Sequence, residues 1–232
     1  MELCARKILS REVINGVKAE FGNDEAVLEL LRKMCLCEGF GDQLAEGSRK
    51  ASQVIGKNAP SYAMHVKGME LTAYEPRAFH GIGLAYATSS RGACHNVGGW
   101  TIRAELIKKE VDRYATRGKG KLVKSIQDVR GYIDSVGICT IPRRALGLTD
   151  EPNESILRYA TGLDFTNQLL IIGERVYNLE RLILVREGIT QKDDNLPPRI
   201  KTEPLPNGPA KGRCITQKML DEMLNEYYDV RG

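Results

Sequence analysis

The chain has 232 residues, of which 42% are hydrophobic, and its 34 basic and 30 acidic side chains give a formal net charge of +4. This composition can supply an ordinary globular core, and the interspersed charges predict a solvated surface with no nucleic-acid footprint. No apolar run approaches the roughly eighteen residues that a membrane span needs, and the N-terminus lacks the shape of a signal peptide, so we expect a cytoplasmic protein that binds neither membranes nor nucleic acid.

Helical periodicity is present from the N-terminus onward. Residues 1–9 have the pattern of the end of a helix with no capping residue before it, and Ser10 would suit the start of a second helix. A strong amphipathic pattern predicts a longer helix over residues 23–39. A further helix is predicted over residues 42–55, where Gly56 ends it.

The next segment has a different pattern. Residues 62–76 alternate loosely and are interrupted by Gly68, which predicts an extended course with one or two short strands. Pro76 then fits the first turn of a helix over residues 77–90.

Helices also dominate the second half of the sequence. Periodicity predicts helices over residues 101–115 and 121–136, and Pro152 starts a short helix that Gly162 stops. The longest predicted helix runs over residues 165–187.

The last part of the chain combines a connection and a helix. Residues 190–213 hold five of the nine prolines and no apolar periodicity, so they predict an extended connection over the surface. Residues 216–228 predict a final amphipathic helix with Thr216 as its cap. The fold class predicted from these patterns is mainly α, with at most short strands.

The chemistry is concentrated in residues 85–99. Small residues over 85–90 indicate close approach to something other than side chains, and Gly92 would allow the backbone to turn or approach a ligand. A structural role is the commoner explanation for a histidine. His95 differs because it lies in a turn between glycines, where its ring could be presented to a ligand as a proton donor or acceptor near neutral pH.

A second candidate is the segment that ends the helix predicted over 121–136. The pattern Asp134-x-x-Gly137-x-Cys139 places a carboxylate and a thiol on one turn, where the thiolate could bind metal and the carboxylate could accept hydrogen bonds. The alternative is a helix that ends in glycine and is followed by a buried cysteine.

The other cysteines give weaker signals. The six cysteines show no paired framework, so we expect reduced thiols. Cys35 and Cys37 would face away from each other on a helix, which argues against a shared metal ion. Cys94 and His95 are adjacent residues, which seldom point at each other, and this argues against a nucleophile pair.

Glu174, Asn178 and Arg181 share one face of the longest predicted helix. This stripe indicates a buried paired network or a site lining, although a solvated face is the commoner explanation.

Taken together, these motifs resemble the aldehyde:ferredoxin oxidoreductase family of tungsten enzymes. Besides Arg91-Gly-Ala-Cys-His95 and Asp134-x-x-Gly-x-Cys139, the resemblance extends over essentially the whole chain, in order. The further matching stretches are residues 41–47, 65–68, 74–77, 83–89, 173–181, 186–188, 193–197 and 226–232.

The resemblance implies a tungsten (or molybdenum) ion held between two pterins beside a [4Fe–4S] cluster. It implies that His95 is the active-site histidine near the tungsten, which transfers protons and orients the substrate. It makes Asp134, Gly137 and Ile138 a pterin-binding turn and Cys139 the last cluster ligand.

The resemblance also bears on the segment before the histidine. It implies that Arg91 is a cofactor-binding residue and that the small residues over 85–90 leave room for a pterin. Val97 departs from the family pattern, since a basic residue often stands there, so one pterin contact is expected to be absent.

A larger departure concerns what the chain lacks. We expect residues 1–63 to be a remnant of the family's second, helical domain and residues 64–232 to be its third, helical domain. The N-terminal sheet domain, the first pterin turn and the other three cluster cysteines are missing. Because a [4Fe–4S] cluster takes four thiolates, Cys139 cannot hold one alone.

Two functions therefore stay open from the sequence. The chain is a C-terminal fragment or split subunit that, with a companion chain, oxidises aldehydes to carboxylic acids and passes electrons to ferredoxin. Alternatively, it is a helical structural or interaction subunit that keeps the family fold and binds no cofactor.

Overall fold

The computed structural model describes residues 1–147 and 150–232 and is mainly helical, as the sequence predicts. A single antiparallel hairpin is its only sheet over the described ranges, with His65 paired to Glu70 and Val66 to Met69. The elements in chain order are α1 (Glu2–Ala5), α2 (Asp24–Leu36), α3 (Phe40–Ala45), α4 (Gly47–Ile55), η1 (Ala59–Tyr62), β1 (His65–Val66), β2 (Met69–Glu70), α5 (His80–Thr88), α6 (His95–Gly98), the π-helical turn η2 (Arg103–Ile107), α7 (Lys119–Val136), α8 (Thr140–Ala145), α9 (Asp150–Thr161), α10 (Leu169–Arg186), η3 (Gln191–Asp193), α11 (Pro198–Thr202) and α12 (Gln217–Arg231).

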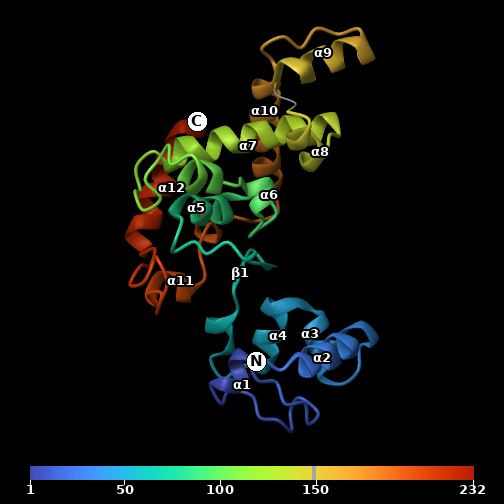
Figure 1. The fold of residues 1–232 in the computed structure, drawn as a ribbon, viewed down its shortest axis with the longest axis vertical. Helices are drawn as coiled ribbons and strands as arrows, with labels where there is room; N and C mark the ends of the chain where they lie inside the picture. Colours follow the sequence, from blue (N-terminus) through green and yellow to red (C-terminus); the bar gives the residue numbers. More distant parts are fainter. Residues whose placement is uncertain (148–149) are drawn as a thin grey trace.

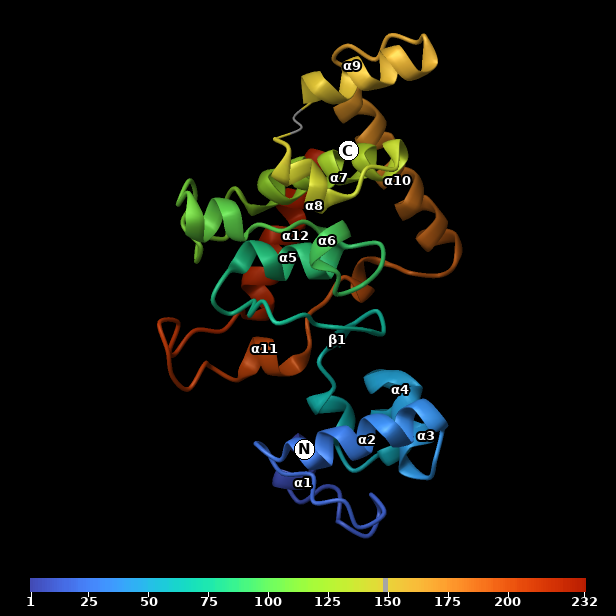
Figure 2. The ribbon, with the colours of Figure 1, turned by 45° about the vertical axis from the view of Figure 1, so that its right-hand side comes forward.

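The elements are arranged along one long axis. In both Figure 1 and Figure 2, α1 to α4 lie at one end of this axis and α9 lies at the other. The N-terminal helices have their own small core of Ile14, Ala19 and Phe40. The division of the chain at residues 63 and 64 stays a prediction.

The main core is built between α5, α7 and α12. All nine residues of α5 are buried, including Tyr86, whose side chain is fully enclosed. The apolar residues that α7, α11, α12 and the nearby loops add to this core are Val123, Leu196, Ile200, Ile215, Leu220, Met223, Leu224 and Tyr227. Each fully buried side chain of this size contributes about 1.5–3 kcal/mol through the hydrophobic effect.

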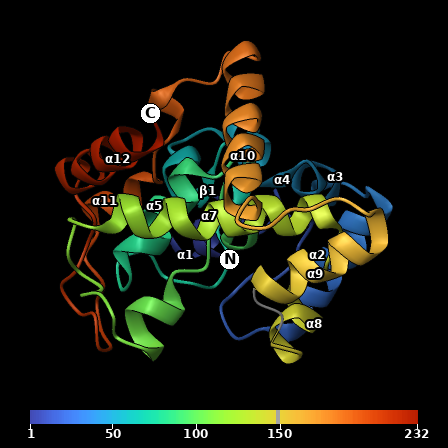
Figure 3. The same cartoon turned by 90° about the horizontal axis from the view of Figure 1, so that it is seen from above.

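Two glycines let other helices touch the backbone of α7. A Cβ added at Gly120 would lie 2.5 Å from the backbone nitrogen of Tyr227 in α12. A Cβ added at Gly131 would lie 2.6 Å from the carbonyl oxygen of Gly173, where α10 runs across α7 (Figure 3). Both crossings are therefore too close for any side chain at these positions.

The structure corrects the prediction for the N-terminal helices. The helix expected over 42–55 is two helices, because Gly47 has a φ of 86°, outside the helical region. The helix expected to begin at Ser10 is absent. Its residues form turns instead, and Asn15, with a φ of 57°, accepts a hydrogen bond from the backbone of Phe40 at 3.1 Å.

Two predictions for later segments are also wrong. Only η2 forms within residues 101–115, since Glu105 turns into a buried polar cluster and Lys109 has a φ of 53°. The connection over 190–213 is not extended throughout, because η3 and α11 interrupt it and α11 buries Ile200 fully in the main core. A single apolar residue in one helical turn is too short a pattern to detect by periodicity.

The buried cluster around Glu105 joins three elements. Its carboxylate pairs with Lys119 at 2.5 Å, with both side chains fully buried, and accepts hydrogen bonds from Thr101 and from the backbone of Gly81. Burial, followed by the positive charge of Lys119, lowers the pKa of the neighbouring His80 from its ordinary 6.5 to about 4. His80 is thus held neutral in the folded protein.

None of the helices in the described ranges is both long and apolar enough to cross a membrane.

Replacing Gly173 with alanine tests the close crossing of α7 and α10. The added methyl would meet the backbone carbonyl of Asp128, which cannot move aside like a flexible side chain, so we expect a loss of about 1–3 kcal/mol in the free energy of unfolding. Helix propensity alone predicts the opposite sign, a gain of about 1 kcal/mol. Urea denaturation measures the difference, with the exposed α7 substitution Ser125→Ala as a control expected to stay within about 0.5 kcal/mol. An unchanged or increased stability of Gly173→Ala would show that the crossing is loose.

The buried His80 makes stability depend on pH. Between pH 6.5 and 4 the unfolded chain binds a proton at this ring while the folded protein does not, so stability falls as the pH falls through this window. The shift corresponds to roughly 3 kcal/mol. Chemical denaturation at several pH values should show a shallower dependence for His80→Leu than for the wild type. His65→Gln, at a half-buried ring outside this cluster, should retain most of the dependence, and equal slopes in His80→Leu and the wild type would contradict the assignment.

Candidate functional site

A cavity of about 420 Å³ brings together most of the residues that the sequence singles out. His95, from the start of α6, faces it together with Asp134 and Cys139, from the end of α7 and the turn after it. The complete lining is Tyr74, His95, Asn96, Trp100, Arg130, Asp134, Ile138, Cys139, Thr140 and Ile141. The two motifs, far apart in sequence, thus form one site.

The end of α7 leaves the backbone open at the cavity. Gly137 takes the left-handed conformation with a φ of 76° and ends the helix, and a Cβ there would have no neighbour within 4 Å. Asp134 and Cys139 are both exposed, and the thiol is free. The alternative of a buried cysteine after the helix is therefore wrong.

His95 is held among aromatic rings. Its ring is half-buried, and its centroid lies 5.1 Å from that of Tyr74, which in turn lies 6.2 Å from that of Trp100. His95 starts the short helix α6, where the sequence predicts only a turn. Cys94 is the cap residue before it, buried, with its sulfur accepting a hydrogen bond from the Val97 backbone at 3.4 Å.

Close backbone contact fixes α6 against α5. A Cβ at Gly98 would lie 2.9 Å from the Cβ of Ser89, and it would also meet the carbonyl oxygen of Ala85. The small residues over 85–90 therefore make room for α6 at Ala85 and Ser89, while Thr88 and Ser90 line a separate cavity of about 320 Å³. Room for a pterin along this segment stays a prediction from the resemblance. None of these small residues lines the cavity of His95.

A buried polar network ties α6 to the two long helices. Gln127 of α7 donates to the carbonyl oxygen of Gly98 at 3.1 Å and to the hydroxyl of Thr88 at 3.1 Å. Its own oxygen accepts hydrogen bonds from Tyr227 at 2.6 Å and Arg231 at 2.7 Å, both in α12. The position of His95 thus depends on α7 and α12 as well as on its own segment.

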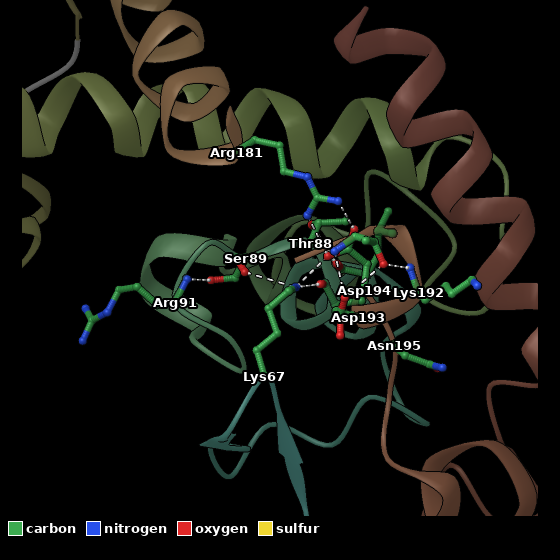
Figure 4. A network of polar contacts seen from close by, with 12 residues as sticks. Lys67, Thr88, Ser89, Arg91, Arg181, Lys192, Asp193, Asp194 and Asn195 are labelled. Atoms are coloured by element: carbon green, nitrogen blue, oxygen red, sulfur yellow. Dashed lines mark hydrogen bonds and ion pairs between the residues drawn. The ribbon is translucent and has the colours of Figure 1, made fainter. Parts of the chain in front are cut away.

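Arg91 does not line the cavity. It is exposed, and Figure 4 shows its side chain directed away from the labelled polar residues around it. Its backbone nitrogen donates to the hydroxyl of Ser89 at 3.3 Å. Its role in cofactor binding stays a prediction from the resemblance.

Arg130 is a lining residue that the sequence analysis did not find. Its guanidinium donates to the hydroxyl of Thr140 at 2.8 Å, which links the last turns of α7 to the start of α8. The available signal was its spacing, since Arg130 lies four residues before Asp134 and therefore on the same face of the helix. Tyr74 and Trp100 line the cavity too, and only the first of these belongs to a stretch that the resemblance covers.

No group of three or more histidine, cysteine, aspartate or glutamate side chains in residues 1–147 and 150–232 is arranged to hold a metal ion. All six cysteines are unpaired. Cys139 is the one thiol among the residues that line the cavity.

Residues 1–232 match the family model described as "Aldehyde ferredoxin oxidoreductase, domains 2 & 3". The chain belongs to the aldehyde ferredoxin oxidoreductase family. The match extends from end to end and agrees with the resemblance and with the helical fold.

Curated relatives support this membership. The chain is 38% identical over 245 residues to a tungsten-containing aldehyde ferredoxin oxidoreductase of Pyrococcus abyssi, covering 100% of the chain and 38% of the relative. The protein of the same name from Pyrococcus furiosus is 40% identical over 235 residues, with coverage of 97% and 37%. An "aliphatic sulfonate oxidoreductase, WOR-like subunit" of Pyrococcus furiosus is 30% identical over 247 residues, with coverage of 100% and 35%. The chain thus spans well under half the length of these relatives.

A solved structure shares the fold. The active-site complex BamBC of benzoyl coenzyme A reductase, in complex with 1,5-dienoyl-CoA, matches with a TM-score of 0.68 over 100% of this chain and 39% of that chain, at 20% identity. At this identity the match supports the fold alone.

The difference in exposure between Cys139 and Cys94 predicts a difference in reactivity. In the folded chain, iodoacetamide should label Cys139 at least about ten times faster than Cys94, whose side chain is buried at 6% exposure. Mass spectrometry of peptides after timed labelling measures both rates, and labelling in denaturant provides the control in which the rates converge. Equal rates in the folded state would mean that the segment between α5 and α6 opens locally and exposes Cys94.

Proposed function

We propose that this chain forms one side of the active site of a tungsten (or molybdenum) pterin oxidoreductase that oxidises aldehydes to carboxylic acids. The observation that carries the proposal is the convergence of His95, Asp134 and Cys139 on one cavity in a chain of this family. A companion chain would supply the part of the site that its longer relatives have and this chain lacks.

The residues at the cavity fit such a cofactor. Asp134 is an exposed carboxylate that can accept hydrogen bonds from the ring N–H groups of a pterin. The open space at Gly137 lets a planar ring approach the backbone, and Ile138 offers an apolar contact beside it. Arg130 adds a positive charge one helical turn away.

When bound, the metal and pterins would take up two electrons as an aldehyde and a water become a carboxylic acid and two protons. His95 would accept one of these protons on a ring nitrogen and release it to solvent, because a neutral imidazole nitrogen is a proton acceptor. Tyr74 and Trp100 limit the orientations of the ring and of a substrate beside it, since their rings form one wall of the cavity.

Cys139 would serve as one ligand of a [4Fe–4S] cluster, with the other three thiolates coming from the companion. The cysteine lies two residues from Gly137, so the proposed pterin turn and the proposed cluster ligand are adjacent in the chain. When bound, such a cluster would supply the electron-transfer chemistry toward ferredoxin. Six unpaired cysteines agree with a reducing compartment, and we propose the cytoplasm.

The decisive experiment is metal analysis of the chain purified with its companion from the native host. We expect tungsten or molybdenum together with iron, and we expect Cys139→Ser to lower the iron content and to slow electron transfer to ferredoxin. Cys35→Ser, at an exposed thiol in α2, is the matched control and should retain the iron. A complex without any of these metals would instead support a structural subunit.

In the same complex, His95→Gln separates proton transfer from cofactor binding. Its metal content should match the wild type while the turnover of aldehyde falls by about 100- to 10,000-fold, the usual contribution of general acid–base catalysis. Unchanged turnover would rule out the acid–base role of His95.

A further inference from the structure

Lys67 lies at an unusual place for a lysine. It forms the two-residue turn between β1 and β2 together with Gly68, and both have positive φ values, 52° and 92°. Turns of this kind favour asparagine, aspartate or glycine, because other residues are strained there. Even so, the side chain of Lys67 is only 6% exposed. Its contacts must therefore account for its presence.

Lys67 reaches a fully buried carboxylate, Asp194, from the loop that follows η3. The Lys67 ammonium lies 2.7 Å from the carboxylate, and Arg181 of α10 contacts both carboxylate oxygens at 3.0 Å. Tyr228 of α12 donates a hydrogen bond to the same carboxylate. Figure 4 shows Lys67 and Arg181 approaching Asp194 from different elements. The stripe of polar residues on α10 thus contributes to a buried network at Arg181.

The same ammonium holds the segment that leads to His95. Lys67 donates to the carbonyl oxygens of Ala87 at 2.5 Å and Ser89 at 3.4 Å, at the end of α5 (Figure 4). The Ala87 carbonyl lies in the last turn of α5, where no further helical N–H follows, and the Ser89 carbonyl accepts a backbone hydrogen bond from Gly92 at 3.3 Å, so the ammonium adds to the contacts that fix where the chain leaves α5.

The hairpin also packs directly against this segment at Gly92. A Cβ at Gly92 would lie 2.9 Å from the Cβ of Met69 and would meet the carbonyl oxygen of Val66. The chain between α5 and α6 is therefore held by Lys67 at its start and by the hairpin backbone three residues before His95.

Stability alone is a weak reason for this ion pair. Burial lowers the pKa of Lys67 from its ordinary value, and the charge of Asp194 only partly opposes this effect. Buried pairs of this kind contribute little net stability relative to apolar side chains, and fixing one arrangement is their better-attested role.

We propose that Lys67 and Asp194 are positioning residues for His95, which set the course of residues 87–94 and thereby the place of the imidazole beside Tyr74. The catalytic meaning of this placement rests on the proposed function. The position of the His95 ring beside Tyr74 depends only on contacts within this chain, whether or not a cofactor binds.

Nuclear magnetic resonance of the histidine rings tests the placement in the full chain. Only three histidines occur, so replacing each with glutamine assigns its ring signals. Because an aromatic ring shifts nearby proton signals by an amount that falls steeply with distance, the His95 signals report its 5.1 Å separation from Tyr74. We expect Lys67→Met to shift the His95 ring signals and to weaken or abolish their cross-peaks to the Tyr74 ring.

Matched variants separate positioning from general effects. Lys192→Met removes a positive charge from an exposed side chain of η3, two residues before Asp194, and it should leave the His95 signals unchanged. Lys67→Arg keeps the charge and should restore part of the wild-type shift. The ring of His80, at the other end of α5, should not move in any of these variants.

Lys67→Met leaves Asp194 paired with Arg181, so the variant should fold. Should it unfold, Lys67→Arg and Asp194→Asn provide the same readout. We expect a smaller shift of the His95 ring signals for Lys67→Arg than for Asp194→Asn. A folded variant of Lys67 or Asp194 whose His95 signals and Tyr74 cross-peaks superimpose on the wild type would overturn the proposal. This outcome is independent of metal content, so it is distinct from a failure of the proposed function.

Discussion

The close contact of α7 with two other helices is the constraint on which the structure depends. At Gly120 and Gly131 the backbones of α12 and α10 come nearer than any side chain would allow. These contacts replace side-chain volume with direct backbone packing, where a single added methyl has no space. Because α7 is held at both crossings, its remaining length can carry polar groups with fixed positions.

Both halves of the candidate site are attached to this helix. Its last turn carries Asp134 and leads to Cys139, while Gln127, two turns earlier, holds the carbonyl oxygen of Gly98 in the helix that begins with His95. A shift of α7 would therefore move the carboxylate, the thiol and the imidazole together. The chain before His95 is held by the Lys67 hairpin at Ala87 and Gly92, so the segment that carries the imidazole is held both before and after it.

The site is nonetheless open on one side. Cys139 and Asp134 are exposed, and apolar side chains near them are exposed as well, with Ile141 at 77% and Leu146 at 71%. Exposed apolar surface beside a candidate cofactor site is typical of a surface that another protein covers. This feature agrees with a chain that spans 38% of the length of a relative.

The sequence by itself determined the helical class, the long helices α7, α10 and α12, the short strands on either side of Gly68 and the chemical candidates His95, Asp134 and Cys139, because these rest on local periodicity, capping and motif spacing. It did not predict α11, the break at Gly47 or the loss of the helix over 101–115, since these depend on what a residue meets elsewhere in the fold. The small residues over 85–90 show the limit most clearly. Their size indicates close approach, but only the tertiary structure decided that the backbone of α6 approaches them. The tertiary structure also decided that Lys67, from the hairpin, holds the segment before His95 and that Arg130 of α7 lines the cavity.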